Sequence, residues 1–134
     1  MDAIGEWDCT SVWLARDGEL RLEHSIGYPH SLGLFYSAIT QAVGLKPNEE
    51  EYILMGMAAY GNPRLHDREM VDDLFEVFDP PRMMLKQNLH KGIGDYVQRK
   101  GWNPMDVAAA AQKIAETYIL GLARWAQRSY NSRN

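Results

Sequence analysis

The stretch that decides the fold is Thr10–His24, TSVWLARDGELRLEH, in which two strand-like segments flank Asp17-Gly18. An Asp-Gly pair favours a two-residue β-hairpin, because a type I′ turn needs positive φ at both central positions. The pattern therefore predicts antiparallel strands over residues 10–16 and 19–24. We expect charged residues on one face of this hairpin and four apolar side chains on its buried face: Val12, Leu14, Leu20 and Leu22.

Downstream of the hairpin, the apolar residues follow helical spacing. Ser31 is placed to cap the start of a helix, and Gly44 is placed to end it in a left-handed turn. Asn48 is placed to cap a second helix, because Glu51 lies three residues later, at the spacing of a capping box. A third helix is predicted over residues 68–78.

The clearest helix is the last one. Asn103 is placed to cap it, and Pro104 suits its first position. Its apolar stripe comprises Val107, Ala111, Ile114, Tyr118, Leu122 and Trp125. The sequence thus predicts an α+β fold, with an N-terminal β-hairpin or small meander followed by four to five helices. Residues 1–30 are assigned to strands and residues 31–134 are mainly helical, so we expect the sheet to continue in polypeptide outside this sequence.

Composition restricts the possible partners. The chain has 134 residues, a length suited to one domain, and its formal charge of −4 is carried with scattered basic residues. Nucleic-acid binding needs a basic patch, so we expect no nucleic-acid partner. No run of about 18 apolar residues exists, so we expect no membrane span. The chain has no charged-then-apolar leader and only one cysteine, Cys9, expected to be a small apolar strand residue; both features favour a cytoplasmic location.

Both ends of the sequence look like cuts at the edges of elements. Met1-Asp2 leads directly into the predicted strands, and residues 129–134 form a polar run just after the last helix. We therefore expect the sequence to be an internal piece of a longer protein.

The most suggestive chemistry lies at the start of the chain, in Asp2-Ala3-Ile4-Gly5-Glu6-Trp7. A carboxylate followed by a glycine and a second carboxylate suits a corner that binds metal and phosphate, although the same pattern also occurs in surface turns. The histidines show no i, i+3 or i, i+4 pairing, and no nucleophile or P-loop motif is present. The glutamates at 49–51 are explained by helix capping, with a cation-binding cluster as the alternative.

Four stretches of the sequence, which include the opening run of residues 2–7, resemble in order the N-terminal catalytic domain of NodU/CmcH-type carbamoyltransferases. The opening run resembles the family's D-G-x-G-E-W. Residues 28–41, YPHSLGLFYSAITQ, resemble P-x-S-L-G-x-F-Y-x-x-x-T, and residues 46–61 resemble K-x-N-E-G-E-Y-K-V-M-G-L-A-P-Y-G. Residues 108–112 and the region of Trp125 resemble the long helix before the family's glycine-rich nucleotide motif. The middle of the chain matches poorly.

The resemblance implies a ribonuclease H-like domain of the actin and sugar-kinase superfamily, joined to a YrdC-like domain of the same polypeptide. It implies an enzyme that combines carbamoyl phosphate and ATP into a carbamoyl-adenylate and passes the carbamoyl group to a hydroxyl acceptor. Acceptors in the family include lipo-oligosaccharide signals and several classes of antibiotic. Nothing in the sequence selects among them.

The resemblance also implies roles for individual residues. Asp2 corresponds to one ligand of a divalent metal, with iron, magnesium and manganese all compatible with a single carboxylate. Gly5 and Glu6 correspond to the neighbouring turn, near the nucleotide phosphates or the carbamoyl group. Substrate contacts are implied at four positions: His30, Tyr36, Glu51 and Tyr52.

The sequence departs from the family pattern at Ala3, Glu50, Ile53 and Ala59, where the family has glycine, glycine, lysine and proline. The family's upstream histidine ligands, glycine-rich nucleotide motif and YrdC-like domain have no counterpart here. We therefore expect the piece to carry one side of a site and to be inactive alone. The alternatives are a non-catalytic helical interaction module and a sugar- or glycerol-kinase relative; the N-E-x-E-Y run counts against the kinase.

Overall fold

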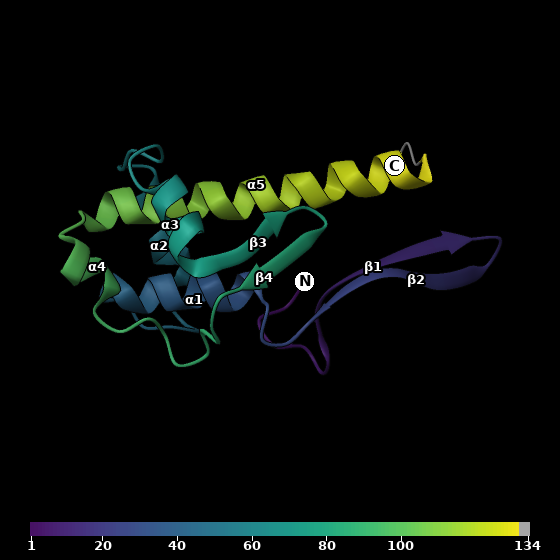
Figure 1. Cartoon of the computed structure of the whole chain (residues 1–134), viewed down its shortest axis with the longest axis horizontal. Helices are drawn as coiled ribbons and strands as arrows, with labels where there is room; N and C mark the ends of the chain where they lie inside the picture. The colour runs from purple at the N-terminus through teal and green to yellow at the C-terminus, as the bar shows by residue number, and fades with distance from the viewer. Residues whose placement is uncertain (132–134) are drawn as a thin grey trace.

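The computed structural model describes residues 1–131, which form an α+β fold of two β-hairpins and five helices. The first hairpin projects from the helical body, whereas the second lies within it (Figure 1). The N-terminal hairpin and the helices after it confirm the predicted fold class. In chain order the elements are β1 (Asp8–Arg16), β2 (Glu19–Gly27), α1 (Leu32–Ala42), α2 (Glu51–Ala58), α3 (Asp67–Leu74), β3 (Phe75–Asp79), β4 (Arg82–Leu85), α4 (Tyr96–Lys100) and α5 (Pro104–Tyr130).

The turn of the first hairpin is the one that the Asp-Gly pair predicts. Asp17 has φ 52° and Gly18 has φ 82°, and Arg16 pairs with Glu19 on either side of them. Both central residues are therefore in the left-handed region, as a type I′ turn requires. The predicted hairpin is confirmed.

The predicted grouping of side chains on the hairpin is wrong. The register places Leu14 opposite Arg21 and Leu20 opposite Ala15. Directly opposite residues of an antiparallel pair share a face, so a two-residue turn puts Leu14 and Leu20 on different faces. The prediction placed residues from both strands on one face without allowing for the alternation of side chains across a two-residue turn.

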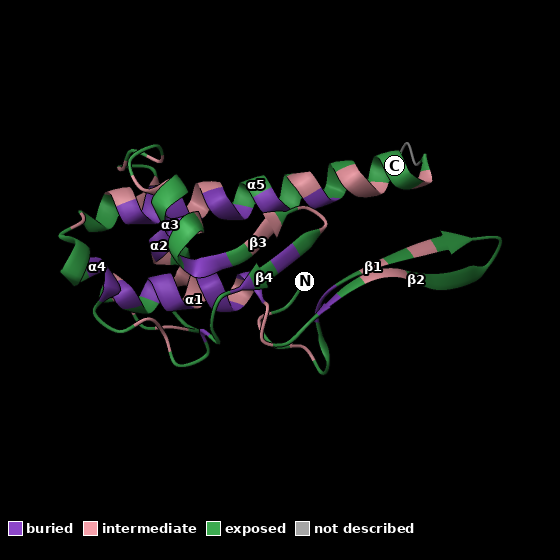
Figure 2. Cartoon of the chain, in the orientation of Figure 1, coloured by how far each residue is buried: buried purple, intermediate pink, exposed green. Residues whose placement is uncertain are grey.

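The outer half of this hairpin is largely exposed (Figure 2). Leu20 is 72% exposed and Trp13 is 55% exposed, whereas Cys9 and Ile26 near the base are buried. The expectation of one buried face therefore holds only at the base. Buried Cys9 agrees with its prediction as a small apolar strand residue, and burial raises the pKa of its thiol.

The core lies between α1, α5 and the elements packed on them. Phe35 and Ile39 of α1 and Tyr118 of α5 are fully buried. The predicted stripe on α5 is confirmed, because every member is buried except Trp125, which is partly buried against the core. No helix within residues 1–131 combines the length and the apolar character needed to cross a lipid bilayer.

Most predicted helix ends are confirmed. The Ser31 and Asn103 side chains each accept a hydrogen bond from a first-turn amide, and Gly44 has φ 92°. The prediction that Asn48 caps the second helix is wrong: Asn48 has φ 66°, and the helix begins at Glu51. The reciprocal half of the capping box does form, since the Glu51 carboxylate accepts the Asn48 N–H.

The predicted third helix is too long. It ends at Leu74, and the chain continues as β3, which pairs with β4 across Pro80-Pro81. A run such as Leu74–Phe78 fits a helix or a strand by periodicity. Contacts between residues far apart in the sequence favour the strand: the ring centroids of Phe75 and Phe35 lie 5.1 Å apart.

Candidate functional site

The N-terminal segment, α1, α2 and α5 surround an open pocket of about 570 Å³, which we call the first pocket. Four of the seven site residues inferred from the sequence line it: Asp2, Tyr36, Glu51 and Tyr52. They come from three segments that are far apart in the chain. Among residues 1–131, no lysine, arginine or histidine side chain lines this pocket, and its charged side chains are the carboxylates of Asp2 and Glu51.

Asp2 lies at the mouth of the first pocket on a fixed backbone. Its N–H donates to the Cys9 carbonyl at 2.7 Å, and the Ser31 hydroxyl donates to its carbonyl at 3.1 Å. Its side chain is exposed, and Oδ1 accepts the Ala3 N–H at 2.6 Å. The carboxylate is therefore anchored close to the backbone and remains accessible to a ligand.

The segment that carries Asp2 crosses the first turn of α1 at close range. A Cβ added to Gly33 would lie 2.8 Å from the Ala3 Cα and 3.2 Å from the Ala3 Cβ. Ala3, which replaces the family's glycine, is partly buried against the core. The methyl group of Ala3 is accommodated because position 33 has no side chain.

Glu51, the first residue of α2, ties α2 to α1. Its Oε1 accepts the Ser37 hydroxyl at 2.7 Å and the Asn48 N–H at 2.6 Å. Burial raises the pKa of Glu51, but hydrogen bonds from Ser37 and from the amides of Asn48 and Glu51 outweigh it, and the pKa is lowered overall. Glu51 is therefore a fixed anion at neutral pH and a weak base.

Tyr36 joins α1 to α5 through a polar chain. Its hydroxyl donates to Gln112 Oε1 at 2.7 Å, and Gln112 Nε2 donates to Glu116 at 2.8 Å. Burial, followed by the charges of Glu116 and Glu51, raises the pKa of Tyr36 to about 12. Tyr36 is therefore a neutral phenol at physiological pH.

Gln112 lines the same pocket and was not among the predicted site residues. Its partner Tyr36 is 76 positions away, so no local pattern links the two. The sequence signal nearest to this contact is the i, i+4 spacing of Gln112 and Glu116 on one face of a helix. That spacing indicates a helical pair and no more.

The rim of the first pocket is apolar. Tyr52 is 68% exposed and Met55 is 56% exposed, and both line the opening, as does Ile119 of α5. An exposed aromatic ring beside carboxylates offers a flat surface for a sugar-like or ring-shaped ligand.

The other three predicted site residues lie outside this pocket. Gly5 has φ 62° and forms a turn between Asp2 and β1, and Glu6 is exposed in the same turn. His30 is half-buried, and its Nδ1 accepts the Leu85 N–H at 3.1 Å. This contact holds β4 against the start of α1, which is the structural alternative for a histidine at this position.

Residues 1–131 contain no group of three or more His, Cys, Asp or Glu side chains arranged to hold a metal ion. Asp2 alone supplies an accessible carboxylate at the position that the resemblance implies. Residues 1–131 could therefore supply one ligand of a metal ion, the Asp2 carboxylate. A complete metal site would need ligands from elsewhere.

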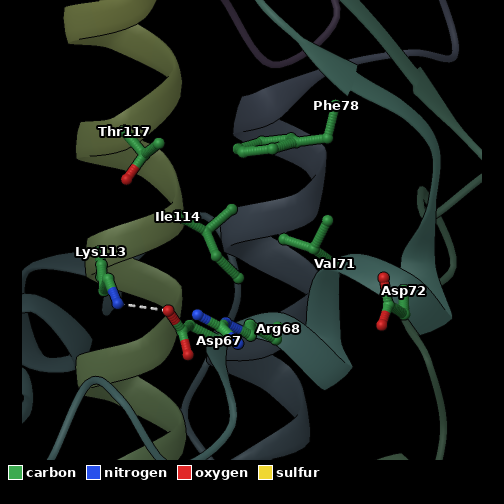
Figure 3. A pocket seen from close by; sticks show the side chains of 8 residues that line it. All are labelled: Asp67, Arg68, Val71, Asp72, Phe78, Lys113, Ile114 and Thr117. Atoms are coloured by element: carbon green, nitrogen blue, oxygen red, sulfur yellow. Dashed lines mark hydrogen bonds and ion pairs between the residues drawn. The ribbon is translucent and has the colours of Figure 1, made fainter.

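A different pocket lies between α3 and α5 (Figure 3). Asp67 and Lys113 form an ion pair within it, and Arg68 and Asp72 line it nearby. Burial raises the pKa of Asp67, but the hydrogen bond from Lys113 and nearby positive charge outweigh it, so the pKa is lowered. Because its central charges neutralise each other, we regard this contact as structural.

The sequence model of the family described as carbamoyltransferase N-terminus matches residues 1–134. The chain belongs to the carbamoyltransferase N-terminus family. The first pocket thus lies in a domain of this family.

Two relatives of this family member are themselves described as uncharacterized. Protein sll1178 of Synechocystis sp. is 46% identical over 91% of the chain, and protein MJ1058 of Methanocaldococcus jannaschii is 30% identical over 93% of it. The chain spans only 23% and 22% of the lengths of these proteins. The similarity therefore concerns one part of much longer polypeptides.

Proposed function

We propose that this chain is part of a longer O-carbamoyltransferase and forms one wall of its transfer site. In the proposed reaction, ATP, carbamoyl phosphate and water yield a carbamoyl-adenylate, inorganic phosphate and pyrophosphate, and the carbamoyl group of the adenylate then passes to a hydroxyl of a sugar-type or natural-product acceptor. The observation that carries the proposal is that Asp2, Tyr36 and Glu51 line one pocket. Each comes from a different family-like stretch of the sequence.

The transfer step determines what the residues on this side of the site have to do. The acceptor oxygen bonds to the carbamoyl carbon, the bond from that carbon to the adenylate phosphate oxygen breaks, and AMP leaves with the electron pair. The hydroxyl proton is released to a base. The site has mainly to position the hydroxyl and stabilise the departing phosphate.

The first pocket suits the acceptor better than the phosphate. Its lining offers the anionic Glu51, the neutral phenol of Tyr36 and the exposed ring of Tyr52. A carboxylate accepts hydrogen bonds from hydroxyl groups, and no lysine, arginine or histidine among residues 1–131 lines this pocket to hold a phosphate. Glu51 would orient an acceptor hydroxyl, since its lowered pKa makes it a poor proton acceptor.

Asp2 is the proposed contribution of this chain to a divalent metal site, with iron or magnesium as the ion. Carboxylate oxygen is a ligand for both metals. A bound metal would supply positive charge beside the reacting groups. The accessible side chain and the fixed backbone of Asp2 fit this role, and the remaining ligands would come from outside residues 1–131.

The proposal is tested with the full-length protein and carbamoyl phosphate labelled in its carbamoyl carbon. Label should move to a hydroxyl acceptor only when ATP and a divalent metal are present. Glu51→Gln should raise KM for the acceptor by about tenfold, whereas Glu49→Gln, on an exposed ion pair, should not. The absence of any ATP-dependent transfer across a panel of sugar and antibiotic acceptors would refute the proposal.

A second candidate is a non-catalytic interaction module that shares the fold, and the exposed apolar residues of the first hairpin allow a test between it and the enzyme piece. Trp13, Leu20 and Leu22 all lie on its outer half. Such surface commonly marks an interface. Light scattering of the chain alone separates the readings: concentration-dependent self-association fits a piece with an uncovered surface, and a monodisperse monomer favours the self-sufficient module.

A further inference from the structure

A smaller pocket of about 210 Å³, the second pocket, lies on the neighbouring face of α1. Residues Gly33 and Tyr36 of α1 face the first pocket, and Ser37 and Gln41 face the second. Successive residues on a helix are about 100° apart, so these are adjacent faces of one element. Nothing described above gives the second pocket a role.

The two pockets share a wall. Ala3 lines both of them. Ser37 and Asn48 line the second pocket and donate the hydrogen bonds that hold Glu51, which lines the first. A ligand in one pocket is therefore separated from a ligand in the other by the Glu51 contacts.

The outer side of the second pocket is a well-anchored loop over residues 88–92. Leu89 is buried, and the His90 N–H donates to Asn88 Oδ1 at 2.9 Å. The Gly92 N–H donates to the Leu89 carbonyl at 2.9 Å. These contacts fix the backbone on both sides of Lys91, whose side chain is exposed.

Gly92 brings this loop against α1. It has φ 82°, and a Cβ at this position would overlap the Gln41 amide oxygen. The positive φ favours glycine at this position, and the Gln41 amide and Lys91 lie around the same cavity.

The charge of the second pocket is opposite to that of the first. Lys91 and His90 line it, and no Asp or Glu does so among residues 1–131. Within the same part of the chain, Lys91 and Lys86 have no carboxylate within ion-pairing distance, whereas Lys46 and Lys113 have one each and Lys100 has two. Of the two, only Lys91 lines this pocket. A lysine left without a carboxylate, beside amide donors, suits an anion.

We propose that the second pocket binds a phosphate group, held by Lys91 with Gln41 and Asn48 as neutral donors. The ligand class is a phosphate monoester or acyl phosphate. If the proposed carbamoyl transfer is correct, the source is carbamoyl phosphate or the phosphate of the nucleotide. The acceptor in the first pocket and the phosphate in the second would then lie on the two sides of the Glu51 wall.

The test is a nuclear magnetic resonance titration of the ¹⁵N-labelled chain at constant ionic strength. Inorganic phosphate, carbamoyl phosphate and AMP are added in separate arms. Saturable shifts are expected at the amides of Asn48, Lys91 and Gly92. Lys91→Gln should raise the dissociation constant by roughly tenfold, the effect of losing a charge-assisted hydrogen bond.

Lys86→Gln is the matched control, because Lys86 lies five positions earlier and its Nζ contacts the Asp72 carbonyl instead. The dissociation constant of Lys86→Gln for each phosphate ligand should stay within about twofold of the wild-type value. Tightest binding of carbamoyl phosphate or of AMP identifies the source of the phosphate. Shifts that do not saturate, lie elsewhere or persist unchanged in Lys91→Gln would overturn the inference. Phosphate binding is measured without transfer, so this result is independent of whether the full-length protein is a carbamoyltransferase.

Discussion

Glu51 shows how one side chain can organise a site. Its carboxylate takes a hydroxyl from α1 and an amide from the loop before α2, so it fixes the angle at which the two helices meet. The same hydrogen bonds lower its pKa and keep it charged. Position and charge state therefore have one cause.

Glu51→Gln should lower the free energy of unfolding at pH 7 by about 1–2 kcal/mol, because charge-assisted hydrogen bonds are lost. A lowered pKa in the folded state contributes stability that is present above about pH 4.3, the ordinary value, and is lost as pH falls through the folded pKa. The difference between variant and wild type should therefore shrink below pH 4. Urea unfolding at several pH values measures it, and a difference that is constant with pH would contradict this account.

At the residue scale, four of the positions selected from the sequence line one pocket, and their roles remain predictions. Resemblance selected Asp2, Tyr36 and Glu51, which the fold gathers in one pocket. It also selected His30, which lies outside this pocket and whose ring accepts a hydrogen bond from Leu85 of β4. No sequence pattern predicts that contact, because the two residues are 55 positions apart. Gln112 was missed for the same reason, because its partner is distant in the chain.

The start of α1 is the element on which the first pocket depends. Ser31 caps this helix and also donates to the backbone carbonyl of Asp2, so the cap and the Asp2 backbone are fixed together. Gly33 leaves the space through which the segment of Ala3 passes.

Gly33→Ala should displace the Asp2 segment, because the new Cβ would lie 2.8 Å from the Ala3 Cα. The matched control is Gly56→Ala in α2, where an added Cβ meets nothing within 4 Å and should stabilise the helix by up to about 1 kcal/mol. Thermal unfolding and amide shifts of residues 2–5 report the two effects. Unchanged amide shifts and equal stabilisation in both variants would show that the Ala3 segment moves aside from residue 33 at little cost in free energy.

Elements were predictable where the signal is local. The caps at Ser31 and Asn103 and the Asp-Gly turn depend on residues within a few positions, and all three are present. The β3–β4 hairpin was missed, because Phe75 becomes part of a strand through its contact with Phe35, forty positions earlier.

The whole molecule consists of a packed helical body and a hairpin that extends beyond it (Figure 1). The body buries its apolar residues around α1 and α5, whereas Leu20 and Trp13 on the hairpin remain exposed. Isolated two-stranded sheets are marginally stable in water. The distal hairpin should therefore be the least stable part of the chain.

Hydrogen exchange should show this difference. Amides of residues 12–22 should be protected on the order of 100-fold less than those of α1 in the chain alone. In the full-length protein the same amides should gain protection if the sheet continues there. Equal protection of the hairpin and α1 in the chain alone would show that the hairpin is stable by itself.

The most direct measurement is the rate of carbamoyl transfer by the full-length protein carrying Asp2→Ala, with Asp8→Ala as the control, since Asp8 lies outside the first pocket. The account predicts a fall of about 100-fold or more for Asp2→Ala and near wild-type transfer for Asp8→Ala. Wild-type turnover in Asp2→Ala would contradict the assignment of this pocket to the reaction.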